Sequence, residues 1–361
     1  MRNIVKKNIL SVNPYVPGKP IEEVKRELGL KHVIKLASNE TPYAPSKNVL
    51  KAIAQAALSV NRYPDGGCYH LRQALAKRLK VSGSQLIFGN GSDELIVLSV
   101  KAFVNPGDEV IMARPSFLIY EIAAQIADAR IRAIPLKNFY YDLEGMLKTI
   151  TPQTKIIFIG NPDNPSGTYV TELQVENFLK QVPRHVLVFF DEAYYEYVSA
   201  KDYPDTLKLL KQYDNIIATR TFSKMYGLAG LRIGYGIASE AIVDILNRVR
   251  EPFNVNSLAQ AAALACLNDG GYYQRIARAI NQEREFLYAQ LEKLGVSFVK
   301  TATNFILINV KADSTKVAQN LLKEGVIIRD MKFWGLNNFI RVTIGTKQEN
   351  KKFISALKKV L

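Results

Sequence analysis

Cysteine is scarce in this chain of 361 residues, which contains only Cys68 and Cys266, far apart in sequence. Two distant cysteines provide neither the spacing of a metal site nor a disulfide framework. No apolar run approaches the roughly 18 residues that a membrane-spanning helix needs. The first residues include Arg2, Lys6 and Lys7, but no apolar segment of signal-peptide length follows them. These absences predict a cytoplasmic protein without a membrane partner.

Long basic runs are also missing, although the net charge is +15. The densest basic stretches are 347–352 and Lys358-Lys359, and both are typical of the faces of a C-terminal helix. We therefore expect lysines spread over solvated helix faces and no nucleic-acid partner. A mildly positive field of this kind would still attract anionic substrates.

The order of apolar and turn-forming segments predicts an arm followed by two domains. Residues 1–34 hold a turn-rich stretch and then a helix from Ile21 to Leu28 that Gly29 ends. Strands and helices alternate over residues 35–252, which predicts an α/β large domain with a mostly parallel sheet. The rhythm changes after about residue 250, and residues 253–361 are predicted to form a small α+β domain.

Three apolar segments show no polar alternation and are therefore predicted to be strands buried on both faces. They are 155–159, 186–190 and 216–219. Further strands are expected at 85–88, 109–112, 304–310 and 340–344, and helices at 71–79, 93–103, 116–127 and 257–291, the last with a break at Gly270-Gly271.

The loops that follow these strands are where a parallel sheet places its ligands. The first loop spans 89–94, where Ser92 and Asp93 could cap the next helix. Free N–H groups at such a helix start suit a phosphate. A plain capping turn would use the same residues, so this loop alone decides nothing.

Two further loops present an amide and a carboxylate. The loop 160–168 is stiffened by two prolines and two glycines and presents Asn164, which can both donate and accept hydrogen bonds. Asp191 ends a buried apolar strand, where an unpaired carboxylate is unfavourable. An ordinary turn, a helix cap or a salt bridge would explain these residues. The functional interpretation is a carboxylate that holds a cationic ring nitrogen.

The fourth loop brings a lysine, Lys224, to the end of a buried strand. A lysine in a dry site has a lowered pKa and becomes a nucleophile toward aldehydes. Arg232 follows closely, and its guanidinium fork suits phosphate. An aldehyde trap, a pyridinium partner, a ring-oxygen donor and a phosphate cup are together what pyridoxal phosphate (PLP) requires.

With these motifs the chain resembles the fold-type-I PLP-dependent aminotransferases and, among them, the histidinol-phosphate aminotransferases, over nearly its whole length. The class motifs are Asn-Pro-x-Asn-Pro-Ser-Gly at 161–167, Asp-Glu-Ala-Tyr at 191–194, and Ser-Lys followed by Gly-Leu-Arg-Ile-Gly within 223–234. The narrower resemblance rests on 14–20, 39–42, 62–65, 91–94, 325–330 and 340–345.

The resemblance implies catalytic and cofactor-binding roles. Lys224 would hold PLP as a Schiff base and shuttle the proton between substrate and cofactor carbons. Asp191 would keep the pyridine nitrogen protonated, and Asn164 and Tyr194 would hydrogen-bond the ring oxygen. The phosphate would be bound by Ser223, Arg232 and the backbone N–H groups of Ser92 and Asp93, and Phe117 would stack on the ring.

The resemblance also implies a homodimer and an anionic substrate. Tyr63 would reach the phosphate of the cofactor in the neighbouring subunit. Arg341 would bind the phosphate of histidinol phosphate or a carboxylate of glutamate, with 2-oxoglutarate as the usual amino acceptor. The substrate-binding residues would be Tyr15, Asn39, Arg329 and Arg341.

Some positions depart from the family and leave the substrate open. Thr41 and Ala44 stand where the family more often has Asn and Gly, and the segment 331–336 is bulky and aromatic. An aromatic amino acid aminotransferase or a threonine-phosphate decarboxylase would share the cofactor residues. A PLP-binding or nucleic-acid-binding regulator is the alternative of another class, although no spare segment has the length of a DNA-binding domain.

Overall fold

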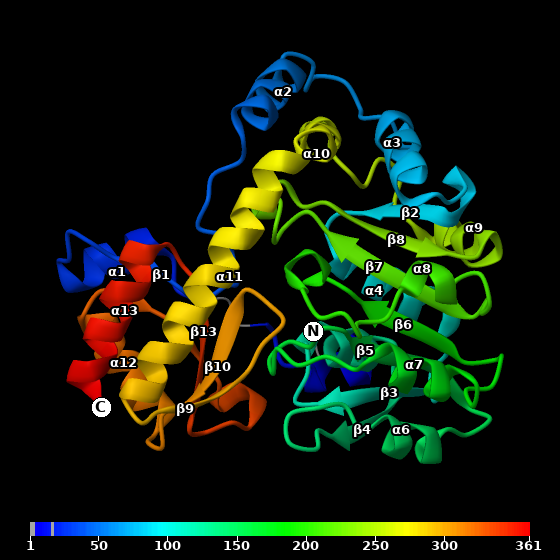
Figure 1. The fold of residues 1–361 in the computed structure, drawn as a ribbon. Helices are drawn as coiled ribbons and strands as arrows, with labels where there is room; N and C mark the ends of the chain where they lie inside the picture. Colours follow the sequence, from blue (N-terminus) through cyan, green and yellow to red (C-terminus); the bar gives the residue numbers. More distant parts are fainter. Residues whose placement is uncertain (1–3, 16–17) are drawn as a thin grey trace.

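The computed structural model describes residues 4–15 and 18–361 and centres on a seven-stranded sheet (Figure 1). The strand order is β2-β8-β7-β6-β5-β3-β4, and only β8 runs antiparallel to its neighbours. Apolar residues without alternation form its central strands, because helices cover both faces. The strands are β2 Leu86–Gly89, β3 Glu109–Arg114, β4 Arg130–Pro135, β5 Thr154–Gly160, β6 Leu187–Asp191, β7 Ile216–Thr221 and β8 Gly234–Ala238.

Two groups of helices enclose this sheet. One face packs against α4 (Ser92–Phe103), α5 (Leu118–Ile126) and α9 (Glu240–Val249). The other face is covered by the helices whose apolar residues share the second large core, namely α3 (Tyr69–Leu79), α6 (Leu143–Thr149), α7 (Glu172–Leu179) and α8 (Thr206–Leu209). The carboxyl ends of the parallel strands are left uncovered by either layer, and the loops described below gather there.

A smaller sheet lies beside the large one (Figure 1). Its four antiparallel strands follow the order β12-β13-β10-β9. Helix α12 (Ser314–Lys323) packs against β12 and β13, and α13 (Lys347–Val360) packs against α12. The strands are β9 Ser297–Val299, β10 Phe305–Asn309, β12 Arg329–Asp330 and β13 Phe339–Thr343. The parallel pair of β1 (Ile34–Lys35) and β11 (Val326–Ile327) ties the chain before the large sheet to this unit.

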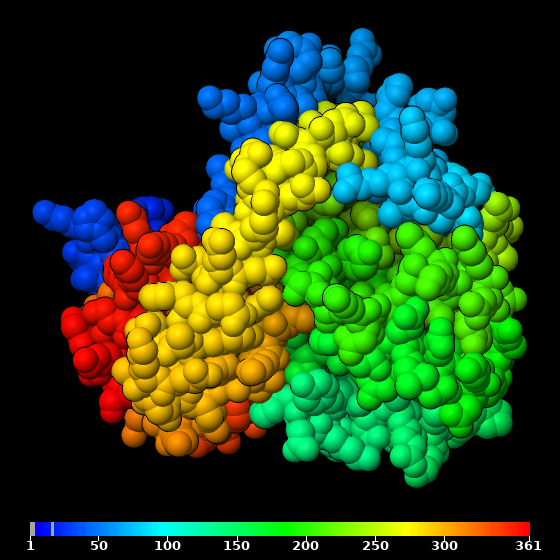
Figure 2. All heavy atoms as spheres, in the orientation of Figure 1, coloured from blue at the N-terminus to red at the C-terminus, as the bar shows by residue number. Residues whose placement is uncertain are grey.

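One long helix, α11 (Gly270–Lys293), connects the two units. It follows α10 (Ser257–Asn268), which packs against α2 (Lys47–Ala57) and α3, and its other end reaches α13 and β9. Figure 2 shows the two helices as a continuous yellow band between the blue segments and the orange and red C-terminal part. The domain limit placed at residue 252 stays a prediction.

The N-terminal segment divides its contacts between the two units. Helix α1 (Ile21–Leu28) buries Val24 against Ala37 and Ile327 of the smaller unit. Asn8 instead donates its amide to the carbonyl of Gln125 at 2.8 Å, on α5. Residues 1–3 and 16–17 of the predicted arm lie outside the described residues. Within the described part of the chain, no helix is long and apolar enough to cross a membrane.

The predicted fold class, a mostly parallel α/β sheet with a smaller α+β unit, is confirmed. The three strands predicted from unbroken apolar runs are β5, β6 and β7 at the centre of the sheet. The helix predicted over 257–291 is broken at Asp269, one residue before the predicted break. The elements that were not predicted include the strands β4, β8 and β9 and the helices α2, α6, α7, α8, α9 and α12.

Candidate active site

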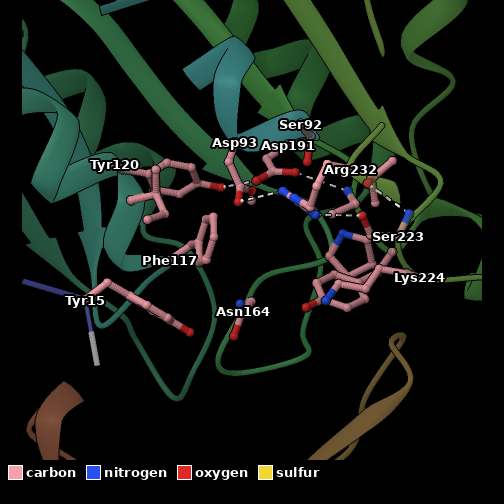
Figure 3. Close-up of a pocket in the computed structure, with 16 residues that line it drawn as sticks. Tyr15, Ser92, Asp93, Phe117, Tyr120, Asn164, Asp191, Ser223, Lys224 and Arg232 are labelled. Carbon is pink, nitrogen blue, oxygen red and sulfur yellow. Dashed lines mark hydrogen bonds and ion pairs between the residues drawn. The ribbon is translucent and has the colours of Figure 1, made fainter. Parts of the chain in front are cut away.

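A cavity of about 290 Å³ opens at the carboxyl ends of β5, β6 and β7 and the N-terminus of α4. Figure 3 shows its side chains converging from these separate loops. Parallel strands deliver residues distant in sequence to one edge of the sheet, which accounts for their meeting here. The lining residues are Tyr15, Ser92, Asp93, Phe117, Ile119, Tyr120, Gly160, Pro162, Asn164, Asp191, Ala193, Tyr194, Thr221, Ser223, Lys224 and Arg232.

One end of the cavity is a set of hydrogen-bond donors suited to a phosphate. Helix α4 starts at Ser92 after Gly91, so its first N–H groups are free of intrahelical partners. The guanidinium of Arg232 lies 3.3 Å from the hydroxyl of Ser223 and 3.4 Å from the carboxylate of Asp93. These groups fit a phosphate dianion, which would share the cationic fork with Asp93.

The alternative in which this loop is a plain capping turn made by Ser92 and Asp93 is wrong. The N-cap residue is Gly91, which has φ of +85° and no side chain with which to cap. Asp93 turns to Arg232 instead, and Glu94 accepts the hydrogen bond of the Asn90 N–H. Leaving the first turn without a side-chain cap keeps its N–H groups available to a ligand.

Close backbone packing shapes this phosphate end. A Cβ atom at Gly91 would lie 2.2 Å from an Nη atom of Arg232, and one at Gly234 would lie 2.5 Å from the Ser92 nitrogen. Only glycine permits the guanidinium and the start of α4 to approach so closely. Gly91 and Gly234 thus form a glycine cradle, in which the Cβ atom of any other residue would clash with Arg232 or with the start of α4.

A buried carboxylate, Asp191, forms the floor of the cavity at the end of β6. It is 6% exposed and accepts hydrogen bonds from the hydroxyl of Tyr120 at 2.8 Å and the N–H of Ala193 at 3.2 Å. Burial raises the pKa of Asp191 to about 6, while the hydrogen bond from Tyr120 and the charge of Lys224 act in the opposite direction. A cation bound beside this carboxylate would stabilise its ionised form.

Tyr120 is a site residue that the sequence analysis missed. It is fully buried on α5, stacked on Phe158 with 4.7 Å between ring centroids, and it points toward Asp191 (Figure 3). Its position one helical turn after Phe117 was the available signal, since residues i and i+3 share a helix face. The two rings meet edge to face at 5.6 Å.

Replacing Tyr120 with Phe is expected to weaken the ionised form of Asp191 without removing it. The tyrosine hydrogen bond lowers the pKa of Asp191, so its loss should raise that pKa and shift the acid limb of the kcat/KM profile to higher pH. At neutral pH we expect a loss of roughly 3- to 10-fold in kcat/KM, which corresponds to the net contribution of one typical hydrogen bond. An unmoved acid limb would contradict this role. Tyr169→Phe is the control, because its hydroxyl donates to Asp202 and it does not line the cavity.

The lysine at the end of the fourth loop reaches the centre of the cavity. Lys224 follows β7, and its Nζ donates to the carbonyl of Ser38 at 3.3 Å. Burial and, after it, the nearby charge of Arg341 lower the pKa of Lys224 to about 8. Since the neutral amine is the nucleophile, a substantial fraction of Lys224 is reactive toward an aldehyde at mildly basic pH.

A hydrogen-bonded set joins the cavity wall to the small unit. Arg341 on β13 donates to the amide oxygen of Asn164 and, at 3.2 Å, to the carbonyl of Ala37. The amide nitrogen of Asn164 is thereby oriented away from Arg341 and toward the cavity, where it can donate. Asn39 lies behind the wall, 1% exposed, and donates to the hydroxyl of Tyr194 at 2.9 Å.

Arg341 is a buried cation suited to an anionic ligand. It is 6% exposed, and burial lowers the pKa of its guanidinium. Among the described residues its Nε has no hydrogen-bond partner, and no carboxylate pairs with the group. A buried charge without a counterion is unfavourable, so an anion reaching this point would be stabilised.

A second arginine stands directly opposite on the neighbouring strand. Arg329 of β12 pairs in register with Arg341 of β13, so both side chains lie on the same face of the small sheet. The guanidinium of Arg329 lies 5.7 Å from the ring of Tyr15 and 4.9 Å from that of Trp334. Two guanidinium groups on one face repel each other, which an anion between them would relieve.

Tyr63 is the one predicted cofactor residue that lies outside this cavity. Its side chain is 83% exposed and stacks on Phe253 at 4.8 Å. The remaining predicted cofactor residues all line the cavity, with Phe117 and Asp191 on the same side as Tyr120 (Figure 3). Tyr15 also lines it, at the end nearest Asn164.

These residues fit PLP on observations of this structure. The glycine cradle at α4 and Arg232 can hold a phosphate. Asp191 is a buried carboxylate whose ionised form a bound cation would stabilise, and Lys224 supplies a reactive amine. Set at the strand ends of a sheet with this topology, they define a PLP-dependent enzyme of fold type I.

Comparison with known proteins narrows this class. Residues 31–357 match the family model of aminotransferases class I and II, and the chain belongs to this family. It is 50% identical to a histidinol-phosphate aminotransferase of Moorella thermoacetica, over 98% of this chain and 92% of that protein. It is 47% identical to a histidinol-phosphate aminotransferase of Caldicellulosiruptor saccharolyticus, over 98% and 99% of the two chains.

Solved structures agree in fold. The histidinol-phosphate aminotransferase of Sinorhizobium meliloti, solved in complex with PLP, superposes with a TM-score of 0.91 at 28% identity, covering 99% of this chain and 97% of that one. Aspartate aminotransferase from Thermus thermophilus with maleate gives a TM-score of 0.87 at 20% identity, covering 99% of both chains, which shows the shared fold alone. The predicted cofactor, PLP, is thus confirmed for this family member.

Proposed function

We propose that the protein transfers the amino group of histidinol phosphate to 2-oxoglutarate, giving imidazole-acetol phosphate and glutamate in histidine biosynthesis. The observation that carries the substrate assignment is the pair Arg329 and Arg341 on one face of the small sheet. Arg341 has an unpartnered Nε and lies close enough to Lys224 to lower its pKa. Relatives with this activity in their names match at 44–50% identity over nearly the whole chain.

The chain's residues would divide the reaction between them. PLP, when bound, supplies an electron-accepting ring that stabilises negative charge at the substrate α-carbon. Asp191 would hold a proton on the ring nitrogen, and Asn164 and Tyr194 would donate to the ring oxygen. Lys224 Nζ, once released by the incoming amine, would take the α-proton and return it to the adjacent carbon as general base and acid.

The arginine pair would orient either substrate in turn. Histidinol phosphate carries a phosphate, and 2-oxoglutarate and glutamate carry a distal carboxylate; both anions suit a guanidinium fork. Each would reach the buried Arg341 at the cost of desolvation, which the unpartnered Nε would help to offset. Excluding water there would strengthen the attraction further.

Half-reactions of the purified yellow enzyme with single amines test the assignment. We expect histidinol phosphate to convert the visible absorbance faster than phenylalanine, by a factor of about 100 or more in kcat/KM, since an anion-binding site rejects a substrate without its phosphate. Threonine phosphate carries the phosphate, so the reaction that it undergoes distinguishes it. Faster conversion by phenylalanine would indicate an aromatic aminotransferase. Release of carbon dioxide from threonine phosphate would indicate the decarboxylase.

We also infer a homodimer, with Tyr63 completing the neighbouring subunit's phosphate site. The support is its exposure of 83% beside Phe253, which is 46% exposed, because exposed aromatic pairs are typical of interfaces. The molar mass in solution tests this arrangement: a stable monomer with full activity would contradict it. A cytoplasmic location and the lack of a nucleic-acid partner stay predictions.

A further inference from the structure

The bulky segment that departs from the family, 331–336, contains a buried tryptophan. Trp334 is 9% exposed although its neighbour Phe333 is 53% exposed. It ends a short turn after β12, and its ring lies in a small apolar cluster with Leu307 and Met331. Leu118 and Phe139 of the large unit pack against this cluster. The indole therefore lies where the two units meet.

A buried hydrogen bond attaches this indole to the cavity wall. Its Nε1 donates to the carbonyl of Ser116 at 3.0 Å. Ser116 directly precedes Phe117, which lines the cavity, and its hydroxyl donates to Asp163 at 3.1 Å. Asp163 in turn directly precedes Asn164 in the loop after β5. One indole N–H thus connects the small unit to both loops that carry Phe117 and Asn164.

The face of the same ring holds an arginine. Arg329 lies 4.9 Å from the centroid of Trp334 and 5.7 Å from that of Tyr15, between two aromatic rings. Such a contact orients the planar guanidinium and is stronger where water is excluded. Arg329 pairs in register with Arg341, so the two side chains are neighbours. The orientation of the Arg329 guanidinium therefore determines how the two cations face a bound anion.

We propose that Trp334 is a positioning residue for the anionic group of the substrate: it fixes Arg329 beside Arg341 and ties that pair to the large-unit loops around the cavity. Through Trp334, the same contacts that hold the small unit against those loops also orient the arginines that bind the anion. The inference rests on the proposed function for the identity of the anion, a phosphate ester on an amine.

Kinetics with histidinol phosphate and with histidinol distinguish a positioning role of Trp334 from a general effect on the stability of the protein. We expect Trp334→Phe, which keeps an aromatic ring but loses the N–H, to lower kcat/KM for histidinol phosphate about 3- to 10-fold, mainly through KM. Trp334→Ala should lower it about 30-fold or more, because the ring contact is lost as well. Histidinol, the same amine without phosphate, should be affected less than about 2-fold by either change. Phe333→Ala, in the same turn, is the matched control.

Fluorescence gives a second readout, because Trp334 is the only tryptophan of the chain. In the holoenzyme the cofactor occupies its own phosphate site, so added inorganic phosphate reports on the substrate's anion site. We expect a saturable change in Trp334 emission on titration with phosphate, lost in Arg329→Gln. Trp334→Phe provides the blank.

The outcomes separate the two proposals. Equal losses with histidinol phosphate and histidinol, or emission that phosphate leaves unchanged, would overturn the role of Trp334. If wild-type enzyme does not turn over histidinol phosphate, the proposed function fails. The phosphate titration alone then decides on Trp334: a saturable response that Arg329→Gln abolishes supports the role, and a flat one overturns it.

Discussion

Substitution of Lys224 by Ala is expected to lower kcat by roughly 10⁴-fold or more, since it removes both the covalent hold on PLP and the general base. The Nζ is the only amine among the cavity-lining residues, so no neighbour can replace it. Single-turnover kinetics with histidinol phosphate measure the loss. The visible absorbance of the bound cofactor, recorded after dialysis, measures the covalent attachment.

Lys208→Ala is a suitable control for that experiment. This lysine lies on α8 with a side chain that is 68% exposed, and its nearest acidic partner is 3.7 Å away. Its removal should leave the spectrum and kcat unchanged. A Lys224→Ala enzyme that stays yellow after dialysis, or keeps a rate near that of the wild type, would remove the basis of the proposed function.

Substitution of Asp191 by Asn should produce a different pattern. The amide has the size of the carboxylate but no charge, so the ring nitrogen would lose the group that keeps it protonated. We expect kcat to fall about 10³-fold or more, the worth of a preorganised charge at the reacting centre. Lys224 is untouched, so the yellow colour should persist. Normal turnover by this variant would exclude the role of Asp191.

The stability of the cofactor-free protein provides an independent readout of the same substitution. The pKa of Asp191 rises from 3.8 to about 6 on burial. Between these values the folded state binds the proton more tightly than the unfolded state, so the free energy of unfolding falls as pH rises. Above about pH 6, the Asn variant should therefore unfold at a higher denaturant concentration than the wild type, both without PLP. The difference should vanish near pH 4.

The sequence predicted the centre of the sheet and most of the cavity for one physical reason. Strands buried on both faces carry unbroken apolar runs, and 155–159, 186–190 and 216–219 are such runs. The ends of parallel strands meet at one edge, so Asn164, Asp191 and Lys224 could be placed together without knowing the strand order.

Three of the features that the sequence did not predict depend on contacts between distant segments. Strand β8 begins inside a loop motif and is glycine-rich, and its antiparallel direction follows only from pairing with β2 and β7. Helix α2 buries little beyond Val49 within its own length and packs on α10, far along the chain. Tyr120 comes to Asp191 from a covering helix rather than from a strand end.

Substrate residues were harder to place than cofactor residues for a related reason. Arg329 and Arg341 lie on the small unit, and their meeting depends on the register between β12 and β13. Asn39 donates to Tyr194 from behind the cavity wall, and its contact with the substrate stays a prediction. A short motif indicates which residue types are present, whereas the side to which each one turns depends on tertiary packing.

The glycine cradle at Gly91 and Gly234 shows that a binding site can depend on residues without a side chain. Neither glycine offers a functional group, yet a methyl group on either would force apart the guanidinium or the helix start that grips the phosphate. Efforts to redesign this pocket should therefore hold both positions fixed along with Arg232. Alanine at either would be expected to weaken cofactor retention while leaving every charged group in place.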